Sequence, residues 1–275
     1  ERQNHEEAVV QEFRLASNGD NKNYDWIIGA YYMDQESSAA QQTELRGFTE
    51  WRMAADGVNP NYLGDFYDLS TNSSFDWTHD KTFTDKALFG EFTYHMSDAL
   101  DLTVGARHFR NEQNVTSQTA FPIWFAFNPV IDADQDDSGT LLKANISYQL
   151  NDDQMIYGTV SEGYRRGGTN AAPVRPDEAY PNDPEWNEFA KDTVVNYEFG
   201  LKGFENDLRY TVSLFYVDWQ DPQLNVATPS GAYYAVANGD SAATKGLETE
   251  FSWAATQDIT VSGGYTYVNA KLTSD

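Results

Sequence analysis

The sequence predicts an all-β fold, an antiparallel meander of long strands that forms part of a transmembrane β-barrel. Two patterns carry this prediction. Apolar and polar residues alternate with period 2 over long runs, which is typical of strands with two unlike faces. Short polar turns also alternate with long irregular connections along the chain. This asymmetry is typical of barrels with tight periplasmic turns and long extracellular loops.

Each predicted strand has one apolar face and one polar face. In the strand predicted over residues 140–150, Leu142, Ile146 and Tyr148 share one face, whereas Lys143 lies on the other. Most of the strands are longer than the roughly 5 to 6 residues common in globular proteins. A further short strand is predicted around residues 232–238. The ten long strands are predicted over residues 9–17, 24–36, 82–96, 100–119, 140–150, 154–168, 193–204, 208–220, 243–255 and 259–273.

The connections predict how the strands are oriented. Long connections are expected over residues 37–81, 120–139, 169–192 and 221–242, and the connections between these are short. A meander with this order has all its short turns at one end of the sheet and its long loops at the other. The alternative is a soluble two-layer β protein with an aromatic core. The one-sided loops disfavour it, because sandwiches carry long loops at both ends.

The composition excludes several classes of protein. Lys and Arg number 18 against 43 Asp and Glu, a formal net charge of −25, which excludes a general nucleic-acid binder with a basic face. Cys is absent, so disulfide scaffolds and thiolate metal sites are excluded. No window reaches the ~18 to 20 apolar residues of a membrane helix, but barrel strands produce no such window. Because the chain starts at Glu1 without a signal sequence, we expect a processed chain or an internal piece.

Several segments share motifs with one known family. Residues 161–170 read SEGYRRGGTN and match the pattern S-x-G-Y-R-x-G-G-x-N, and residues 196–202 read NYEFGLK and match N-Y-E-x-G-x-K. Residues 238–250 contain NGD and GLETE, which match N-x-G/A and G-x-E-x-E, and residues 11–17 read QEFRLAS and match E-x-R-L-x-S. In order and spacing these segments resemble the TonB-dependent outer-membrane receptors, over most of the chain.

The resemblance implies an active importer in the outer membrane of a Gram-negative bacterium. Such a receptor is a barrel of about 22 strands with a plugged lumen. Its loops capture a scarce nutrient, with a ferric siderophore as the leading candidate. A TonB box and plug couple it to the TonB–ExbB–ExbD complex. Residues 1–275 are then part of one barrel domain, in contact with lipid and lipopolysaccharide, without plug or closing strands, and are not expected to transport anything alone.

The polar faces of the predicted strands carry charges of both signs. In a barrel of this family they would face the plug, and a solvated lumen is an equally good interpretation. The candidates for plug contact are Arg107, Glu162, Arg165, Arg166, Glu198, Lys202, Arg209, Glu248 and Glu250.

The long connections are rich in acidic and aromatic residues. Aromatic faces can stack on a catechol, a corrin or a sugar, so the aromatic residues are candidates for ligand contact. The alternative is that they pack the loops on one another. The acidity disfavours a bare anionic ligand. The candidates are Trp51, Tyr62, Phe66, Tyr67, Trp77, Trp124, Tyr180, Trp186, Tyr233 and Tyr234.

The sequence indicates no enzyme, no catalytic residues and no resident cofactor. It contains no H-E-x-x-H, G-x-S-x-G, P-loop or dinucleotide fingerprint. Asp132, Asp134 and Asp136 offer the hard oxygen atoms that calcium prefers, but the segment fails the EF-hand pattern at its sixth and twelfth positions, so a solvated acidic loop is favoured. Two other functions stay open, a passive porin or structural barrel and a soluble ligand-binding β protein.

Overall fold

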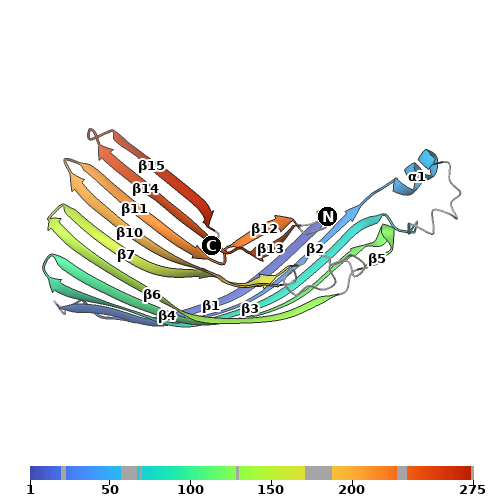
Figure 1. Cartoon of the computed structure of the whole chain (residues 1–275), viewed down its shortest axis with the longest axis horizontal. Coiled ribbons are helices and arrows are strands. Elements are labelled where there is room, and N and C mark those ends of the chain that lie inside the picture. Colours follow the sequence, from blue (N-terminus) through green and yellow to red (C-terminus); the bar gives the residue numbers. More distant parts are fainter. Residues whose placement is uncertain are drawn as a thin grey trace.

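The main sheet is an open, curved trough. The computed structural model describes residues 1–19, 23–56, 67–68, 70–127, 130–170, 188–227 and 234–273. Ten strands follow one another as neighbours in the order β1-β2-β3-β4-β6-β7-β10-β11-β14-β15 (Figure 1). Every pair of neighbours in this order is antiparallel. The predicted meander of ten long strands is confirmed.

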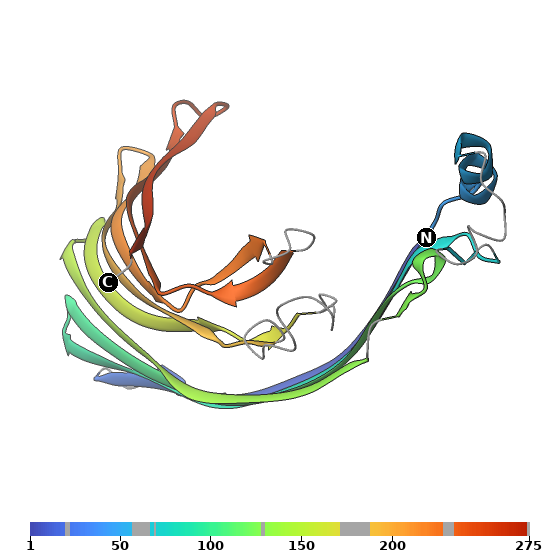
Figure 2. The ribbon, with the colours of Figure 1, turned by 45° about the vertical axis from the view of Figure 1, so that its right-hand side comes forward.

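Almost all of the described chain belongs to these strands or to small elements beside them. Two short hairpins, β8 with β9 and β12 with β13, lie on the concave side of the trough (Figure 2). Helix α1 (Phe48–Asp56) and the 3-10 helix η1 (Pro122–Trp124) are short. In the described part of the chain, neither is long and apolar enough to cross a membrane. The strands are β1 (Arg2–Ala16), β2 (Tyr24–Glu44), β3 (Ser73–Ser97), β4 (Leu100–Phe121), β5 (Ala126–Phe127), β6 (Ile131–Asn151), β7 (Gln154–Arg165), β8 (Gly168–Thr169), β9 (Glu188–Phe189), β10 (Asp192–Glu205), β11 (Leu208–Gln220), β12 (Gln223–Ala227), β13 (Tyr234–Asn238), β14 (Ser241–Ala254) and β15 (Thr260–Thr273).

The predicted long connections over residues 37–81 and 120–139 are wrong in large part, because strands continue into them. β2 pairs with β3 without interruption from Tyr24 to Thr43, and β6 begins at Ile131. The outward face loses its apolar residues in these extensions, so the amphipathic pattern fades. The backbone ladder continues all the same, because each strand still satisfies the hydrogen bonds of its neighbour. The hairpins therefore project well beyond the apolar part of the sheet.

The convex face of the sheet carries an apolar band. Leu102 lies opposite Ile146, and Leu214 lies opposite both Phe199 and Leu247, so these side chains share one face at one level. Leu214 is 55% exposed and Phe199 56% exposed, as expected for side chains that face lipid. Each strand contributes about five outward positions to the band, or ~30 Å of strand. Tilted strands of this length fit the ~25 Å band of transmembrane barrels.

The upper limit of the band is a change from apolar to polar residues on the convex face. In β3 the outward positions change from Leu88 to Lys86, and in β4 from Ala106 to His108. At the other end of the strands the turns are tight. Between β10 and β11 the turn residues Asn206 and Asp207 both have positive φ, 49° and 63°, as two-residue hairpins require. The extended hairpins of β2 to β6 therefore lie beyond the band, on the side opposite to the short turns.

A charge placed on the convex face should destabilise the protein in a bilayer. We expect Leu214→Arg to lower the free energy of unfolding of the full-length protein by about 2 to 4 kcal/mol, the cost of Arg near the bilayer midplane. The matched control is Thr266→Arg, which places the same side chain on the concave face opposite Glu248. Urea unfolding in lipid vesicles measures both. Equal losses for the two variants would show that the faces are assigned wrongly.

Candidate functional site

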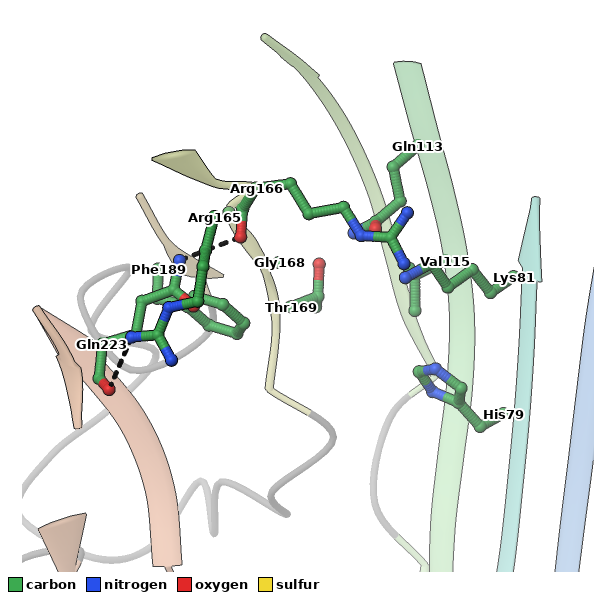
Figure 3. Close-up of a pocket in the computed structure, with 11 residues that line it drawn as sticks. His79, Lys81, Gln113, Val115, Arg165, Arg166, Gly168, Thr169, Phe189 and Gln223 are labelled. Atoms are coloured by element: carbon green, nitrogen blue, oxygen red, sulfur yellow. Dashed lines mark hydrogen bonds between the residues drawn. The ribbon is translucent and has the colours of Figure 1, made fainter. Parts of the chain in front are cut away.

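A pocket lies on the concave face, beyond the apolar band. Its volume is about 450 Å³. One wall is the extended hairpin of β3 and β4, and the other is formed by residues 165–169, Phe189 of β9 and Gln223 of β12, whose elements lie inside the trough (Figures 2 and 3). The lining residues are His79, Lys81, Gln113, Val115, Arg165, Arg166, Gly167, Gly168, Thr169, Phe189 and Gln223.

The first wall follows from strand alternation. His79 and Lys81 are two residues apart in β3 and therefore point to the same face. Val115 of β4 lies directly opposite Lys81, and Gln113 lies opposite Phe83. Because the ladder fixes this register, four positions of two strands converge on one side of the sheet. All four lie above Leu88, where the apolar band ends.

The second wall depends on two glycines. A Cβ atom on Gly167 would lie 2.6 Å from the carbonyl oxygen of Phe189, and one on Gly168 would lie 2.5 Å from the ring of Phe189. Gly167 meets backbone, so only glycine there lets the chain after β7 pass this close to β9, and a side chain at Gly168 would require the Phe189 ring to move. This is the physical reason for the paired glycines in residues 161–170. The close approach brings Arg166 and Thr169 to the pocket.

Asp192 holds the second wall in place. Its side chain is 1% exposed and accepts hydrogen bonds from the backbone N–H of Arg165 (3.1 Å), from Arg165 Nε (2.9 Å) and from the backbone N–H of Gln223 (3.1 Å). Gln223 Nε2 in turn donates to the carbonyl oxygen of Arg166 (2.8 Å). Burial alone would raise the pKa of Asp192, but these hydrogen bonds outweigh it and hold the pKa below its ordinary value. The carboxylate is therefore charged at neutral pH and ties three segments together.

The pocket has a positive electrostatic character. The guanidinium carbon of Arg166 lies 3.9 Å from the centre of the Phe83 ring, and Lys81 Nζ lies 5.9 Å from the same ring. Burial and the nearby Arg166 charge lower the pKa of Lys81 to about 8. Burial and the Lys81 charge also lower the pKa of His79. Figure 3 shows Arg166 reaching across the pocket toward Lys81, whereas Arg165 points the other way, toward Gln223.

Three buried polar atoms of the lining lack a hydrogen-bond partner in the described structure. They are His79 Nδ1, Gln113 Oε1 and Thr169 Oγ1. Buried polar groups in folded proteins are nearly always paired, with protein, ligand or water. These atoms belong to both walls and line the same space. The pocket can therefore offer directional hydrogen bonds as well as positive charge to a bound molecule.

Most of the residues predicted to face a plug do lie on the concave face. Arg107 Nη2 is 3.3 Å from Asp85 Oδ2, and Glu198 accepts a hydrogen bond from the hydroxyl of Tyr157. Lys202 Nζ lies 4.8 Å from the centre of the Tyr157 ring. The register places three more on this face, namely Arg209, Glu248 and Glu250. Their contact with a plug stays a prediction.

The other three predicted plug-facing residues lie closer to the long-hairpin end of the sheet. Glu162 lies where β6 and β7 separate, and its Oε2 accepts a hydrogen bond from the backbone N–H of Leu142 (2.9 Å) at the free edge of β6. Arg165 belongs to the Asp192 contact, and Arg166 lines the pocket. These two arginines lie beyond the apolar band.

None of the predicted ligand-contacting aromatic residues that the structure describes lines the pocket. Trp51, Tyr67 and Trp124 each pack against Phe48, with ring centroids 5.4 to 6.4 Å apart, at the tip of the extended hairpins. This arrangement matches the alternative that loop aromatics pack on one another. Tyr234 begins β13 and is 76% exposed. Five candidates lie outside the described residues: Tyr62, Phe66, Tyr180, Trp186 and Tyr233.

Two predicted loop positions are wrong because they lie in strands. Trp77 belongs to β3 and stacks on His79, with ring centroids 5.6 Å apart. Asp132, Asp134 and Asp136 belong to β6 and alternate along its exposed face. Strand geometry spaces such residues by ~7 Å along the chain, so they do not converge on one ion. In the part of the chain that the structure describes, no three His, Asp or Glu side chains form a group that could hold a metal.

Sequence reasoning missed most of the pocket. The predicted connection over residues 37–81 contains His79 and Lys81, and no motif points to Gln113, Thr169 or Gln223. A signal for the first two exists. Residues 75–83 alternate Phe, Trp, His, Lys and Phe with polar residues, which is the period of a strand. The close approach of the segment after β7 to β9 depends on tertiary contacts, which leave no periodic pattern in the sequence.

Comparison with known proteins gives a consistent result. The model of the family described as "TonB dependent receptor-like, beta-barrel" matches residues 4–275. A pesticin receptor of Yersinia enterocolitica is 26% identical over 245 residues, which cover 89% of this chain and 31% of the relative. The ferric yersiniabactin uptake receptor FyuA from Yersinia pestis superposes with a TM-score of 0.75 at 20% identity, over 99% of this chain and 36% of that one. The copper transporter OprC superposes with a TM-score of 0.67 at 16% identity, over 99% and 39%. This chain spans about a third of their lengths.

Removing the charge of Asp192 should loosen the second wall. We expect Asp192→Asn to speed amide hydrogen exchange at Arg165 and Gln223 by about 10- to 100-fold, because hydrogen bonds to a charged group contribute ~1.5 to 3 kcal/mol. Asp218→Asn is the control, since Asp218 accepts a side-chain hydrogen bond from Gln220 outside the pocket. Mass spectrometry of the full-length protein measures the exchange of the peptides that contain Arg165 and Gln223. Unchanged exchange in Asp192→Asn would show that this carboxylate does not hold the wall.

The lowered pKa of Asp192 predicts a pH dependence with a definite sign. The stabilisation should be fully present above the ordinary Asp pKa of ~3.9 and should fade as the pH falls through the lower value of the folded protein. Peptide exchange at Arg165, corrected for intrinsic rates, should therefore show constant protection between pH 7 and pH 5. Loss of protection in that range would contradict the assignment.

Proposed function

Because this chain belongs to the TonB-dependent receptor-like β-barrel family, we propose that the full-length protein is a receptor that imports a ferric siderophore with energy supplied through TonB. The family is one of receptor barrels in the outer membrane of Gram-negative bacteria, and transport, not catalysis, is the activity proposed for the full-length protein. The apolar band on the convex face agrees with this location. The nutrient and the energy source are the proposed part.

The observation that carries the proposal is the position of the pocket. It lies on the inner wall and beyond the apolar band, on the side of the long hairpins, so a molecule arriving from outside meets it before it crosses the membrane. A volume of about 450 Å³ suits part of a small chelate. The ferric yersiniabactin receptor shares the fold and is named for uptake of an iron chelate. A copper transporter has the same fold, so the fold alone does not identify the nutrient, and uptake must be measured.

The inner wall below the pocket supports a plugged barrel. Charges of both signs line it, and several are already paired within the wall, as Lys143 is with Glu91 (2.9 Å). Such a wall offers hydrogen bonds to a polar plug domain, through which TonB, ExbB and ExbD would act. The segments β8–β9 and β12–β13 also fold into the trough above the band (Figure 2). Both features favour capture of a ligand over free diffusion through an open porin.

Deletion of the gene should abolish growth on the cognate ferric siderophore under iron limitation. Radioactive iron uptake from a panel of ferric siderophores would identify that chelate. Restoring the full-length gene should restore uptake in a strain with TonB and fail to do so in a strain without it. Uptake that persists without TonB would favour a passive channel, and normal uptake of every chelate after deletion would overturn the siderophore assignment.

A further inference from the structure

One edge of β6 is open beyond the apolar band. β6 runs from Ile131 to Asn151, but β7 pairs with it only from Lys143 onward. Over residues 131–142 the described structure places β4 on one side of β6 and no strand on the other. In Figure 1, β6 continues along the trough past the end of β7. Because β6 and β7 are neighbours in the middle of the sheet, this open edge is separate from the two outer edges at β1 and β15.

Two contacts establish which backbone groups point to the open side. The N–H of Leu142 donates to Glu162 Oε2 (2.9 Å), and the C=O of Ser138 accepts from Lys191 Nζ (2.9 Å), so both groups point away from β4. Backbone groups of successive residues point to opposite sides of a strand, and the register between β4 and β6 has no shift. The N–H and C=O groups of residues 132, 134 and 136 therefore also point to the open side. No described residue binds these groups.

This part of the edge lies beyond the apolar band. Thr140 lies opposite His108, where the outward face of β4 turns polar, so residues 131–136 lie farther along the extended hairpin. An unpaired backbone is tolerated there because water solvates it, whereas a bilayer would not allow it. An exposed strand edge is a template to which another strand can add through backbone hydrogen bonds. Residues 131–136 offer about the length of an average strand.

Three carboxylates follow the open edge on the convex face. Asp132, Asp134 and Asp136 are exposed and lie two residues apart, so ~7 Å separates each from the next. None of the three forms an ion pair among the described residues. A strand that adds at this edge would place every second side chain beside these carboxylates. Lys or Arg at those positions would be attracted, whereas a second copy of the same edge would bring acids together.

The concave side of the edge favours small uncharged side chains. Ala133 lies there between two of the carboxylates, and its own side chain is small. Gln135 Nε2, the next concave position, already donates to the carbonyl oxygen of Phe189 (3.2 Å). A matching strand would therefore alternate basic residues on the convex face with small uncharged residues on the concave face.

We propose that the open edge of β6 binds an extended basic segment of a protein partner by β-augmentation. The backbone of residues 132, 134 and 136 supplies the hydrogen bonds, and the three carboxylates select Lys or Arg at alternate positions of the partner. This inference goes beyond the proposed import of a chelate and does not depend on it. It assigns the extended hairpins a polypeptide ligand, and it places that ligand outside the pocket.

The direct test measures the binding of short peptides to the detergent-solubilised full-length protein by fluorescence anisotropy. The probe is a labelled peptide in which Lys alternates with Val, and a peptide with Glu in place of Lys is the charge control. Two further controls carry backbone N-methyl groups on all Lys or on all Val residues. We expect the Glu peptide and one of the two methylated peptides to bind at least tenfold more weakly, because an added strand turns the N–H groups of every second residue toward β6.

Two outcomes of the peptide experiment would overturn the proposal. If the Lys–Val peptide does not bind, the edge is not a site for basic segments. If both methylated peptides bind as well as the parent, the carboxylates attract cations without the addition of a strand.

Variants of the receptor separate the backbone from the charge. Asp134→Pro removes an N–H that points to the open side and leaves the pairing with β4 in place, because proline is tolerated at such edge positions. Asp134→Asn loses the same charge but keeps the N–H. We expect at least tenfold weaker binding of the Lys–Val peptide by Asp134→Pro and about two- to fivefold weaker binding by Asp134→Asn.

The control variant is Asp80→Asn. Asp80 is exposed on the convex face of β3, away from the open edge, so this variant should bind the peptide as the wild type does. Heat-modifiability on gels confirms that each variant is folded. Wild-type binding by folded Asp134→Pro would contradict a role for the backbone.

Hydrogen exchange locates the bound peptide and identifies other occupants. The Lys–Val peptide should slow exchange in residues 131–136 at least tenfold and change little at Leu142, whose N–H is already bonded to Glu162. Protection elsewhere and none in residues 131–136 would overturn the site. Self-association of the wild type that Asp134→Pro abolishes, measured by analytical ultracentrifugation without peptide, would make a second copy the occupant and overturn the basic partner. None of these measurements uses a ferric chelate, so the site and the siderophore function can fail independently.

Discussion

The backbone ladder of the sheet is the constraint on which the rest of the structure depends. Inside a bilayer every N–H and C=O group must be paired within the protein, which only helices and closed barrels achieve. In the described chain this pairing is continuous from β1 to β15. A continuous ladder fixes the register, and the register fixes which side chains face lipid. The same register extends beyond the apolar band, where it places Lys81 opposite Val115 on the concave wall.

The sequence contains enough information for the strands and too little for the pocket. All ten long strands follow from alternation, and their turn-side ends agree closely with the structure, as at Leu100 and Leu208. In β2, β3 and β6 the opposite ends extend further than the alternation of apolar residues predicts, because the outward face turns polar above Leu88. Lys81 lies in such an extension and is therefore not predicted as part of a strand. Arg166 belongs to a sequence motif, but its position in the pocket depends on tertiary contacts between the segment after β7 and β9. The periodicity of the sequence does not predict such contacts.

The acidic composition and the cationic pocket are compatible because charges that are adjacent on a strand lie on opposite faces of the sheet. Asp80 of β3 and Asp132 and Asp134 of β6 are exposed on the convex side of the extended hairpins. Lys81 and Arg166 are on the concave side. Alternation along a strand separates such neighbours onto opposite faces, so Asp80 and Lys81 are adjacent in sequence and act on different surroundings. A net charge therefore predicts solubility and long-range field but not the sign of a particular site.

Arg165 and Arg166 show how the register of the ladder determines which side chains reach the pocket. Arg165 is the last residue of β7 and lies opposite Asp192 in the ladder, so its charge is neutralised by the carboxylate that fixes the second wall. Arg166 is the first residue beyond the strand, and its side chain points the other way, into the pocket. Because Asp192 holds the backbone of Arg165 and Gln223, a molecule bound in the pocket would not bear the entropy cost of ordering this wall. The same backbone pairing that a bilayer requires therefore also fixes the walls of the charged pocket beyond the apolar band.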